Sequence, residues 1–183
     1  MRDKISMARI NVLHPAIATE VGTLINKSES ILPNNVAIRI VQGLRSIEEQ
    51  NALYAQGRTK PGKIVTKAKG GQSYHNYGLA IDFAFIIDRD RNGTYETLSW
   101  DTREDFDKDG ISDWREVVNI FKAAGYIWGA DWDNDGVTKE DGDKDEHLVD
   151  SPHLQKTFGY NVKQLLEKYN KKDFIHPYQY VNL

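Results

Sequence analysis

Ser73-Tyr74-His75-Asn76-Tyr77-Gly78-Leu79-Ala80-Ile81-Asp82 is the stretch around which the rest of the chain is organised. It places a histidine and an aspartate seven residues apart, with a glycine between them. A second cluster, Asp150-Ser151-Pro152-His153, follows downstream. Together the two clusters supply two histidines and two carboxylates. That inventory is typical of a catalytic zinc site, which has three protein ligands and a free carboxylate as base.

The first cluster predicts a reversal of the chain between its two candidate ligands. In a straight strand, at about 3.3 Å per residue, His75 and Asp82 would lie more than about 20 Å apart. Zinc ligands lie only about 2 Å from the metal. The chain must therefore fold back between them, and Gly78 can supply the unusual dihedral angles.

Asp82 is the most informative single residue of the chain. It interrupts the apolar run 79–85, which predicts a buried strand. A carboxylate inside such a strand is unfavourable unless it is paired or bound to a metal. The alternative to a metal is a buried salt bridge with an arginine such as Arg45.

The second cluster adds a ligand and a base. Pro152 holds Ser151 extended, so that Asp150 and His153 can reach one cavity. A carboxylate beside a metal-activated water can take its proton and pass it to a leaving amine. The helical His-Glu-x-x-His signature is absent. Of the other histidines, His14 and His176 are interpreted as core or surface residues, and His147 is the nearest competitor of His153.

The composition limits the classes of protein to which this chain can belong. The 183 residues are enough for one domain with a substantial core, and 39% hydrophobic with 28% charged residues indicates a globular chain. A net charge of -3 is too small to favour nucleic acid or an anionic membrane as a partner. There is no cysteine, which excludes disulfides and thiolate zinc sites. No segment resembles a signal peptide or a membrane anchor, so we expect cytoplasmic synthesis.

Hydrophobic periodicity predicts an α+β fold with a small antiparallel sheet flanked by helices. Helices are expected at 16–29, from Ser46 to Gly57, at 113–124 and at 161–169. Strands are expected at 36–41, 80–87, 94–99, 126–128, 147–150 and 153–155. Ser46 and Glu49 form a capping-box pattern. Residues 59–72 read as a long loop and the chain from 171 as a tail. We expect one domain, 1–183, in which about 161–183 form a short C-terminal helix and tail, without a separate wall-binding module.

The two clusters resemble the zinc peptidases of the D,D-carboxypeptidase and Hedgehog-like family. More narrowly, they are similar to the L-alanyl-D-glutamate endopeptidases of bacterial cell-wall enzymes and phage endolysins. The resemblance runs from Leu13 to about Gln155. It includes the motifs Gln42-Gly43-Leu44-Arg45, Glu49-Gln50, Leu53-Tyr54-Ala55-Gln56-Gly57-Arg58 and Trp128-Gly129-Ala130-Asp131-Trp132.

The resemblance implies His75, Asp82 and His153 as zinc ligands and Asp150 as catalytic base. It also suggests Arg45 and Ser73 as residues that contact the substrate. The implied activity is hydrolysis of peptidoglycan stem peptides at the L-Ala–D-Glu bond, by a monomer that reaches the cell wall after release or export. Two alternatives stay open: a D,D- or L,D-carboxypeptidase on the same scaffold, and a non-catalytic, metal-dependent wall-binding module.

Acidic loops between the two clusters raise the question of a second metal. The segment 105–116 follows the twelve-residue calcium loop: Asp105, Asp107, Asp109 and Glu116 supply side-chain oxygens, and Ile111 stands at the backbone-carbonyl position. No entering helix is evident, and Asp113 with Glu116 would also suit a helix cap without metal. A second loop begins at Asp131 but has Gly142 at position 12, and the segment 88–93 reads best as a hairpin turn.

Overall fold

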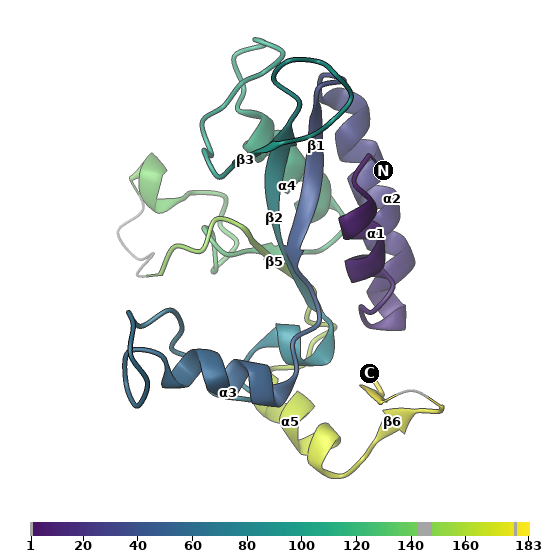
Figure 1. Ribbon diagram of the computed structural model, residues 1–183. Helices are drawn as coiled ribbons and strands as arrows, with labels where there is room; N and C mark the ends of the chain where they lie inside the picture. Colours follow the sequence, from purple (N-terminus) through teal and green to yellow (C-terminus); the bar gives the residue numbers. More distant parts are fainter. Residues whose placement is uncertain (1, 143–147, 178) are drawn as a thin grey trace.

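The computed structural model of the protein describes residues 2–142, 148–177 and 179–183 (Figure 1). The helices are α1 (Lys4–Ile10), α2 (Pro15–Ile31), α3 (Ile47–Ala55), α4 (Asp113–Ala123) and α5 (Val162–Asn170), with the 3₁₀ turns η1 (Tyr74–Tyr77) and η2 (Lys139–Asp141). The strands are β1 (Val36–Gln42), β2 (Ala80–Ile87), β3 (Thr97–Ser99), β4 (Ile127–Trp128), β5 (His153–Gln155), β6 (Phe174–Ile175) and β7 (Tyr180–Val181).

Antiparallel pairing joins all strands of the main sheet, whose order is β1-β2-β5-β4, with β3 pairing to the far end of β2. β1 and β2 form the longest pair, with β1 at one edge of the sheet, and the short β5 and β4 extend the sheet beside the start of β2. The predicted α+β class is confirmed. A second sheet consists of the hairpin β6-β7.

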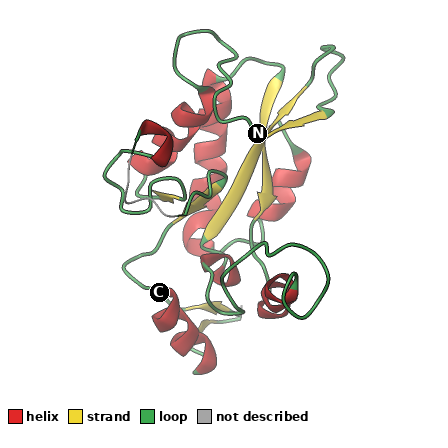
Figure 2. Cartoon of the chain, turned by 90° about the vertical axis from the view of Figure 1, so that its left-hand side faces the viewer, coloured by secondary structure: helices red, strands yellow, loops and turns green. Residues whose placement is uncertain are grey.

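The core is built on β2, whose residues are all buried except the partly exposed Asp82. From α2, the side chains of Ile17, Val21 and Ile25 lie at helical spacing on one buried face. From α4, Trp114 stacks on Phe83 with ring centroids 4.4 Å apart. α1 and α2 lie alongside β1 (Figure 1), and α2 also contacts α4. Figure 2 shows helices packed around the sheet from the perpendicular direction.

The functional end of the molecule lies where β1 ends and β2 begins. α3, η1 and α5 gather there, below the sheet in Figure 1. A capping box between Ser46 and Glu49 starts α3, as the sequence predicted, and Gly57 follows its end with φ 71°. Within the described part of the chain, no helix has the length and apolar character needed to span a bilayer.

Several element predictions were wrong or incomplete. Residues 148–150 are not a strand, and His147 lies outside the described residues. The return strand predicted at 94–99 is only β3, because the turn after β2 is longer than a two-residue hairpin. The hairpin β6-β7 and the helix α1 were not predicted. Asp3 caps α1 by accepting from the amides of Ile5 and Ser6.

Candidate metal centre and active site

His75 is placed by the turn η1, and the predicted reversal of the chain is confirmed. Ser73 precedes η1, and its hydroxyl accepts from the His75 amide at 3.4 Å. Gly78 ends η1 in the left-handed region at φ 67° and donates its amide to the His75 carbonyl at 3.2 Å. A Cβ at Gly78 would lie 2.7 Å from the backbone nitrogen of His14, so only glycine fits there. The chain then enters β2, which carries Asp82.

The register of the sheet places the other two ligand candidates together. Asp82 in β2 stands directly opposite His153, the first residue of β5, in the antiparallel pair. Residues opposite each other across such a pair have side chains on the same face. Asp82 and His153 are 71 positions apart in the sequence but adjacent in the sheet.

The three side chains meet in a nearly equilateral triangle of atoms. His75 Nε2 lies 3.2 Å from Asp82 Oδ1 and 3.2 Å from His153 Nδ1, and His153 Nδ1 lies 3.1 Å from Asp82 Oδ1. Ligand atoms of a tetrahedral zinc with bonds of about 2.0 Å lie about 3.3 Å apart. The spacing of the three atoms therefore fits one zinc ion bound on the open side of the triangle.

The outward nitrogens of both imidazoles are held by hydrogen-bond acceptors. His75 Nδ1 lies 2.8 Å from the Gly43 carbonyl oxygen, and His153 Nε2 lies 2.9 Å from Gln155 Oε1. These partners assign the proton to the outward nitrogen of each ring and leave the inward nitrogen with a free lone pair. When both imidazoles are neutral, three acceptors face one another, an arrangement that a metal cation satisfies.

Electrostatics agree with an ionised Asp82. Burial alone would raise the pKa of Asp82, but the imidazoles of His75 and His153 outweigh it and hold this pKa well below its ordinary value. Burial would lower the pKa of His153, and its hydrogen bond to Asp82 reverses the shift, so the pKa is raised. The alternative partner of Asp82, Arg45, lies farther away, with Nη2 4.0 Å from Oδ2.

Asp150 lies in the same cleft and is held by its backbone. Its amide donates to the Gly129 carbonyl at 2.7 Å, and its own carbonyl accepts from the His153 amide at 2.9 Å. Its side chain is open to the cleft. Desolvation in the cleft and the nearby charge of Asp82 raise the pKa of Asp150, against the opposing charges of His153, His75 and Arg45. A raised carboxylate pKa suits a general base.

Arg45 faces the cleft as a fixed cation. Its Nη1 donates to Gln50 Oε1 at 2.9 Å, and its amide donates to the His75 carbonyl at 3.0 Å. Its Nε is buried without a hydrogen-bond partner. A guanidinium held in this way is suited to bind a carboxylate or a developing oxyanion. Ser73 also lines the cleft, with its hydroxyl in contact with the His75 amide.

The cleft has a volume of about 670 Å³ and brings together every residue predicted for the zinc site and its substrate. It also contains residues whose role was not predicted, among them Gln155 and Trp132, whose ring centroid lies 5.4 Å from that of His153. Gln155 follows His153 by two residues on one strand and so shares its face, a signal that strand periodicity carries. The Gly43 carbonyl gives no such signal in the sequence.

Gly129 is a second unpredicted requirement of the site. A Cβ there would lie 2.4 Å from the Asp150 carbonyl oxygen, 3.0 Å from the His153 Cβ and 3.1 Å from the Asp150 Cβ. Real Cβ atoms do not approach so closely. The absence of a side chain at Gly129 is therefore what lets the segment with Asp150 and His153 pack against β4.

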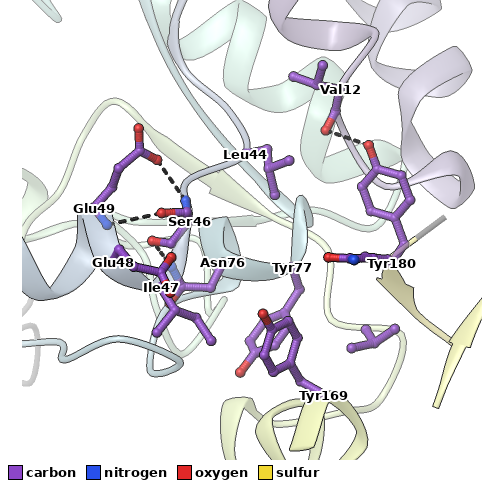
Figure 3. Close-up of a pocket in the computed structure, with 12 residues that line it drawn as sticks. Val12, Leu44, Ser46, Ile47, Glu48, Glu49, Asn76, Tyr77, Tyr169 and Tyr180 are labelled. Atoms are coloured by element: carbon purple, nitrogen blue, oxygen red, sulfur yellow. Dashed lines mark hydrogen bonds between the residues drawn. The ribbon is translucent and has the colours of Figure 1, made fainter. Parts of the chain in front are cut away.

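Figure 3 shows a separate pocket of about 610 Å³ behind η1. It is lined by Tyr77, Tyr169 and Tyr180, and by the first turn of α3, where Ser46 and Glu49 bind each other in the capping box (Figure 3). None of the described residues that line it is a histidine. Its two carboxylates belong to the helix start. The described residues of this pocket therefore do not repeat the ligand set of the cleft.

The residues predicted for calcium lie on the loop that leads into α4. Carboxylate oxygens of Asp105, Asp107 and Asp109 lie within 4.8 Å of one another, and the same holds for Asp107, Asp113 and Glu116. Ile111 is exposed at the end of the loop. The alternative that Asp113 and Glu116 cap the helix was wrong, because Ser112 is the N-cap and accepts from the Arg115 amide.

Two imidazoles and a carboxylate around one point, with a free carboxylate and an arginine beside them, can hold one zinc ion and support hydrolysis of an amide. Residues 66–137 match a family model described as D-alanyl-D-alanine carboxypeptidase. The chain is also 45% identical, over 143 residues, to the peptidoglycan L-alanyl-D-glutamate endopeptidase CwlK of Bacillus subtilis (strain 168). That similarity covers 78% of this chain and 72% of CwlK. The chain belongs to this family of cell-wall peptidases.

Two solved structures show a more distant likeness. One is a variant of the vancomycin resistance D,D-pentapeptidase VanY in complex with Zn(II), with a TM-score of 0.42 and 16% identity over 79% of this chain and 72% of that chain. The other is the vancomycin resistance D,D-dipeptidase VanXYg in complex with a D-Ala-D-Ala phosphinate analogue, with a TM-score of 0.45 and 21% identity over 90% of this chain and 61% of that chain.

Proposed function

We propose that this protein is a zinc-dependent peptidase that hydrolyses peptidoglycan stem peptides at the L-Ala–D-Glu bond. The observation that carries the proposal is the triangle of His75 Nε2, Asp82 Oδ1 and His153 Nδ1, with sides of 3.1–3.2 Å. The bond specificity is supported by the 45% identity to CwlK. In this proposal His75, Asp82 and His153 hold the zinc.

Asp150 is the catalytic base of the proposed reaction. When bound, zinc polarises the scissile carbonyl and makes the attacking water more acidic. Asp150 takes a proton from that water and delivers it to the departing amine. Its raised pKa keeps the carboxylate basic enough to accept the proton, and its two backbone hydrogen bonds fix its position beside His153.

Arg45 and Ser73 contact the substrate in this account. Stem peptides carry carboxylates, and the guanidinium of Arg45, held by Gln50, can bind one of them or the oxyanion that forms during attack. Ser73 contributes a hydroxyl to the wall of the same cleft. The positive charge of Arg45 also offsets the negative charge that Asp82 and Asp150 bring to the site.

A carboxypeptidase that removes a terminal D-Ala is the second candidate. The description of the matching family, D-alanyl-D-alanine carboxypeptidase, favours it. Arg45 would then bind the terminal carboxylate of the peptide. The zinc ligands are the same for both activities, so the products distinguish them. A non-catalytic wall-binding module is the third candidate, and Asp150 argues against it because binding needs no base.

Digestion of purified peptidoglycan by the zinc-loaded protein, followed by mass spectrometry of the products, tests the proposal. The His75→Ala variant is the matched control. We expect a new free amino terminus on D-Glu with the wild-type protein and none with the control. Release of D-Ala would instead establish the carboxypeptidase, and unchanged peptidoglycan with zinc bound would support the binding module.

The same proposal includes the organisation of the molecule. Residues 1–183 act as one domain, supported by a core that extends from Ile10 to Val181. The protein acts as a monomer in this proposal. The site of action is the cell wall, where the stem peptides are.

A further inference from the structure

The loop 105–116 carries five acidic side chains that converge. Oxygens of Asp105, Asp107 and Asp109 lie within 4.8 Å of one another, and Asp107 is also within 4.8 Å of Asp113 and Glu116. Asp107 therefore joins the two groups into one cluster. Acidic clusters are common on protein surfaces, so the convergence alone does not identify a metal site.

Asp113 provides the second observation. Its side chain is fully buried, with 0% exposure. Oδ2 accepts a hydrogen bond from the Phe106 amide, whereas Oδ1 has no hydrogen-bond partner. Glu116 Oε2 is buried and lacks a partner as well. An unpaired buried carboxylate oxygen is strongly unfavourable unless a cation or a donor satisfies it.

The surroundings of these two carboxylates make a cation the fitting partner. The buried, unpaired oxygens of Asp113 and Glu116 lie in one cluster with the carboxylate of Asp107, which also groups with Asp105 and Asp109. Like charges around an unpaired carboxylate increase the free energy of the metal-free state, and a divalent cation removes that penalty.

We propose that the loop 105–116 binds one calcium ion through the side chains of Asp105, Asp107, Asp109, Asp113 and Glu116 and the carbonyl oxygen of Ile111. These residues occupy positions 1, 3, 5, 9, 12 and 7 of the twelve-residue calcium loop. Gly110 supplies the required sharp turn at position 6, with φ 94°. All six ligands are hard oxygens, which suits calcium, whereas magnesium retains several waters in near-ideal octahedral geometry.

The other two acidic clusters lack this feature. One oxygen of Asp131 forms an ion pair with Lys122 and the other accepts from the Gly136 amide. Both oxygens of Asp88 accept backbone amides, from Asn92 and Gly93. Among the described residues, the buried side-chain oxygens without a partner are those of Asp113 and Glu116.

The loop is connected to the catalytic cleft through α4. Trp114, next to Asp113, stacks on Phe83 and donates its indole N–H to the Ser151 carbonyl at 3.3 Å. Phe83 follows Asp82, and Ser151 follows Asp150. Calcium bound at the start of α4 therefore stabilises the position of the elements that carry the zinc ligand and the base.

Calorimetric titration of calcium into zinc-loaded, calcium-free protein tests the proposal without any peptidoglycan. The outcome is thus independent of the proposed peptidase activity. We expect one calcium per chain and a higher melting temperature in its presence. Glu116→Gln, which keeps the shape of the side chain and removes its charge, should bind calcium at least about tenfold more weakly. Asp135→Asn, in the loop after Asp131, is the matched control and should bind like the wild type.

Terbium luminescence is a second measurement of the site, and it includes the wild type and the control variant in case Glu116→Gln does not fold. Terbium, which takes the place of calcium at oxygen sites, should emit on excitation of tryptophan in the wild type and in Asp135→Asn, because Trp114 adjoins the site. Calcium should quench that emission. The proposal is overturned if the wild type binds no calcium up to about 10 mM, above the range of weak extracellular sites. It is also overturned if Asp135→Asn loses binding while Glu116→Gln keeps it.

Discussion

Asp82 contacts His75, His153 and Arg45, and so lies at the centre of the cleft's interactions. One of its oxygens completes the triangle with His75 and His153, and the other faces Arg45. The sequence predicted a cation near Asp82 because a carboxylate in an apolar strand needs one. The sequence did not indicate which oxygen faces which partner, because that depends on the register between β2 and β5.

Substitution of Asp150 should separate zinc binding from catalysis. Asp150→Asn should keep one zinc per chain and lower kcat by about 10²–10⁴-fold, because the amide cannot accept the proton of the attacking water. Zinc content by atomic absorption and turnover of a stem peptide are the two measurements. His75→Ala, the control, should lose both zinc and turnover. Turnover at the wild-type rate in Asp150→Asn would show that another group is the base.

The sequence predicted the candidate ligands and the base. It did not predict the backbone groups that hold them in place. The two clusters contain the residue types of a zinc site, and Asp82 also interrupts an apolar run. The Gly43 carbonyl and the empty space at Gly129 have no chemical signature in the chain. They depend on contacts between segments far apart in sequence, and only the folded structure reveals them.

At the scale of elements, the junction of β4 with the segment before β5 is the most constrained. Gly129→Ala would place a methyl group 2.4 Å from the Asp150 carbonyl oxygen. We expect a loss of about 1–3 kcal/mol in the free energy of unfolding and a large loss of turnover, because Asp150 and His153 must both shift.

Gly22→Ala is the matched control for that substitution. Gly22 lies in α2, and nothing lies within 4 Å of the position that the methyl group of an alanine would take there. Alanine should therefore stabilise the helix by about 0.5–1 kcal/mol. Urea unfolding and turnover of both variants are the measurements. Full turnover in Gly129→Ala would mean that the junction does not fix the base.

The environment of His14, which contacts the start of α2 and strand β7, predicts that the stability of the fold depends on pH. Its Nδ1 accepts from the Ala16 amide at the start of α2, and its Nε2 lies 2.8 Å from the Val181 carbonyl in β7. Burial lowers the pKa of His14, with the contact to Val181 opposing. In the pH range just below the ordinary histidine pKa, the imidazole of His14 therefore stays neutral in the folded protein and takes up a proton in the unfolded chain. Its contribution to stability is present above its ordinary pKa of about 6.5 and is lost as pH falls below it.

Urea unfolding of wild type and His14→Asn between about pH 5 and about pH 8 measures that contribution. Asparagine keeps an acceptor for the Ala16 amide and does not titrate. We expect the stability of the wild type to fall more steeply with decreasing pH than that of the variant. Parallel curves would mean that His14 does not couple pH to folding.

The elements that sequence reasoning predicted best are those with long periodic patterns, such as α2 and the pair β1 and β2. β6 and β7 have two residues each, too few for a periodic signal, and their position depends on packing against α5 and on His14. The segment 148–150 was wrongly predicted as a strand because two apolar residues resemble a short strand. In the structure Leu148 and Val149 are exposed beside the cleft.

Across the whole molecule, three separate parts of the chain meet at the candidate metal centre. His75 comes from η1, Asp82 from β2 and His153 from β5. The helices that pack on the sheet hold these three elements in register, and Trp114 links the sheet to the segment with Asp150. The fold therefore brings the three ligand atoms into a triangle whose sides are close to those of a zinc site.

Anomalous diffraction at the zinc absorption edge, from crystals of the zinc-loaded protein, tests directly whether these three side chains bind the metal. We expect a single anomalous peak on the open side of the triangle formed by His75 Nε2, Asp82 Oδ1 and His153 Nδ1, facing Asp150 across the cleft. A peak at another set of side chains, or no peak at the triangle in protein that carries one equivalent of zinc, would contradict this expectation.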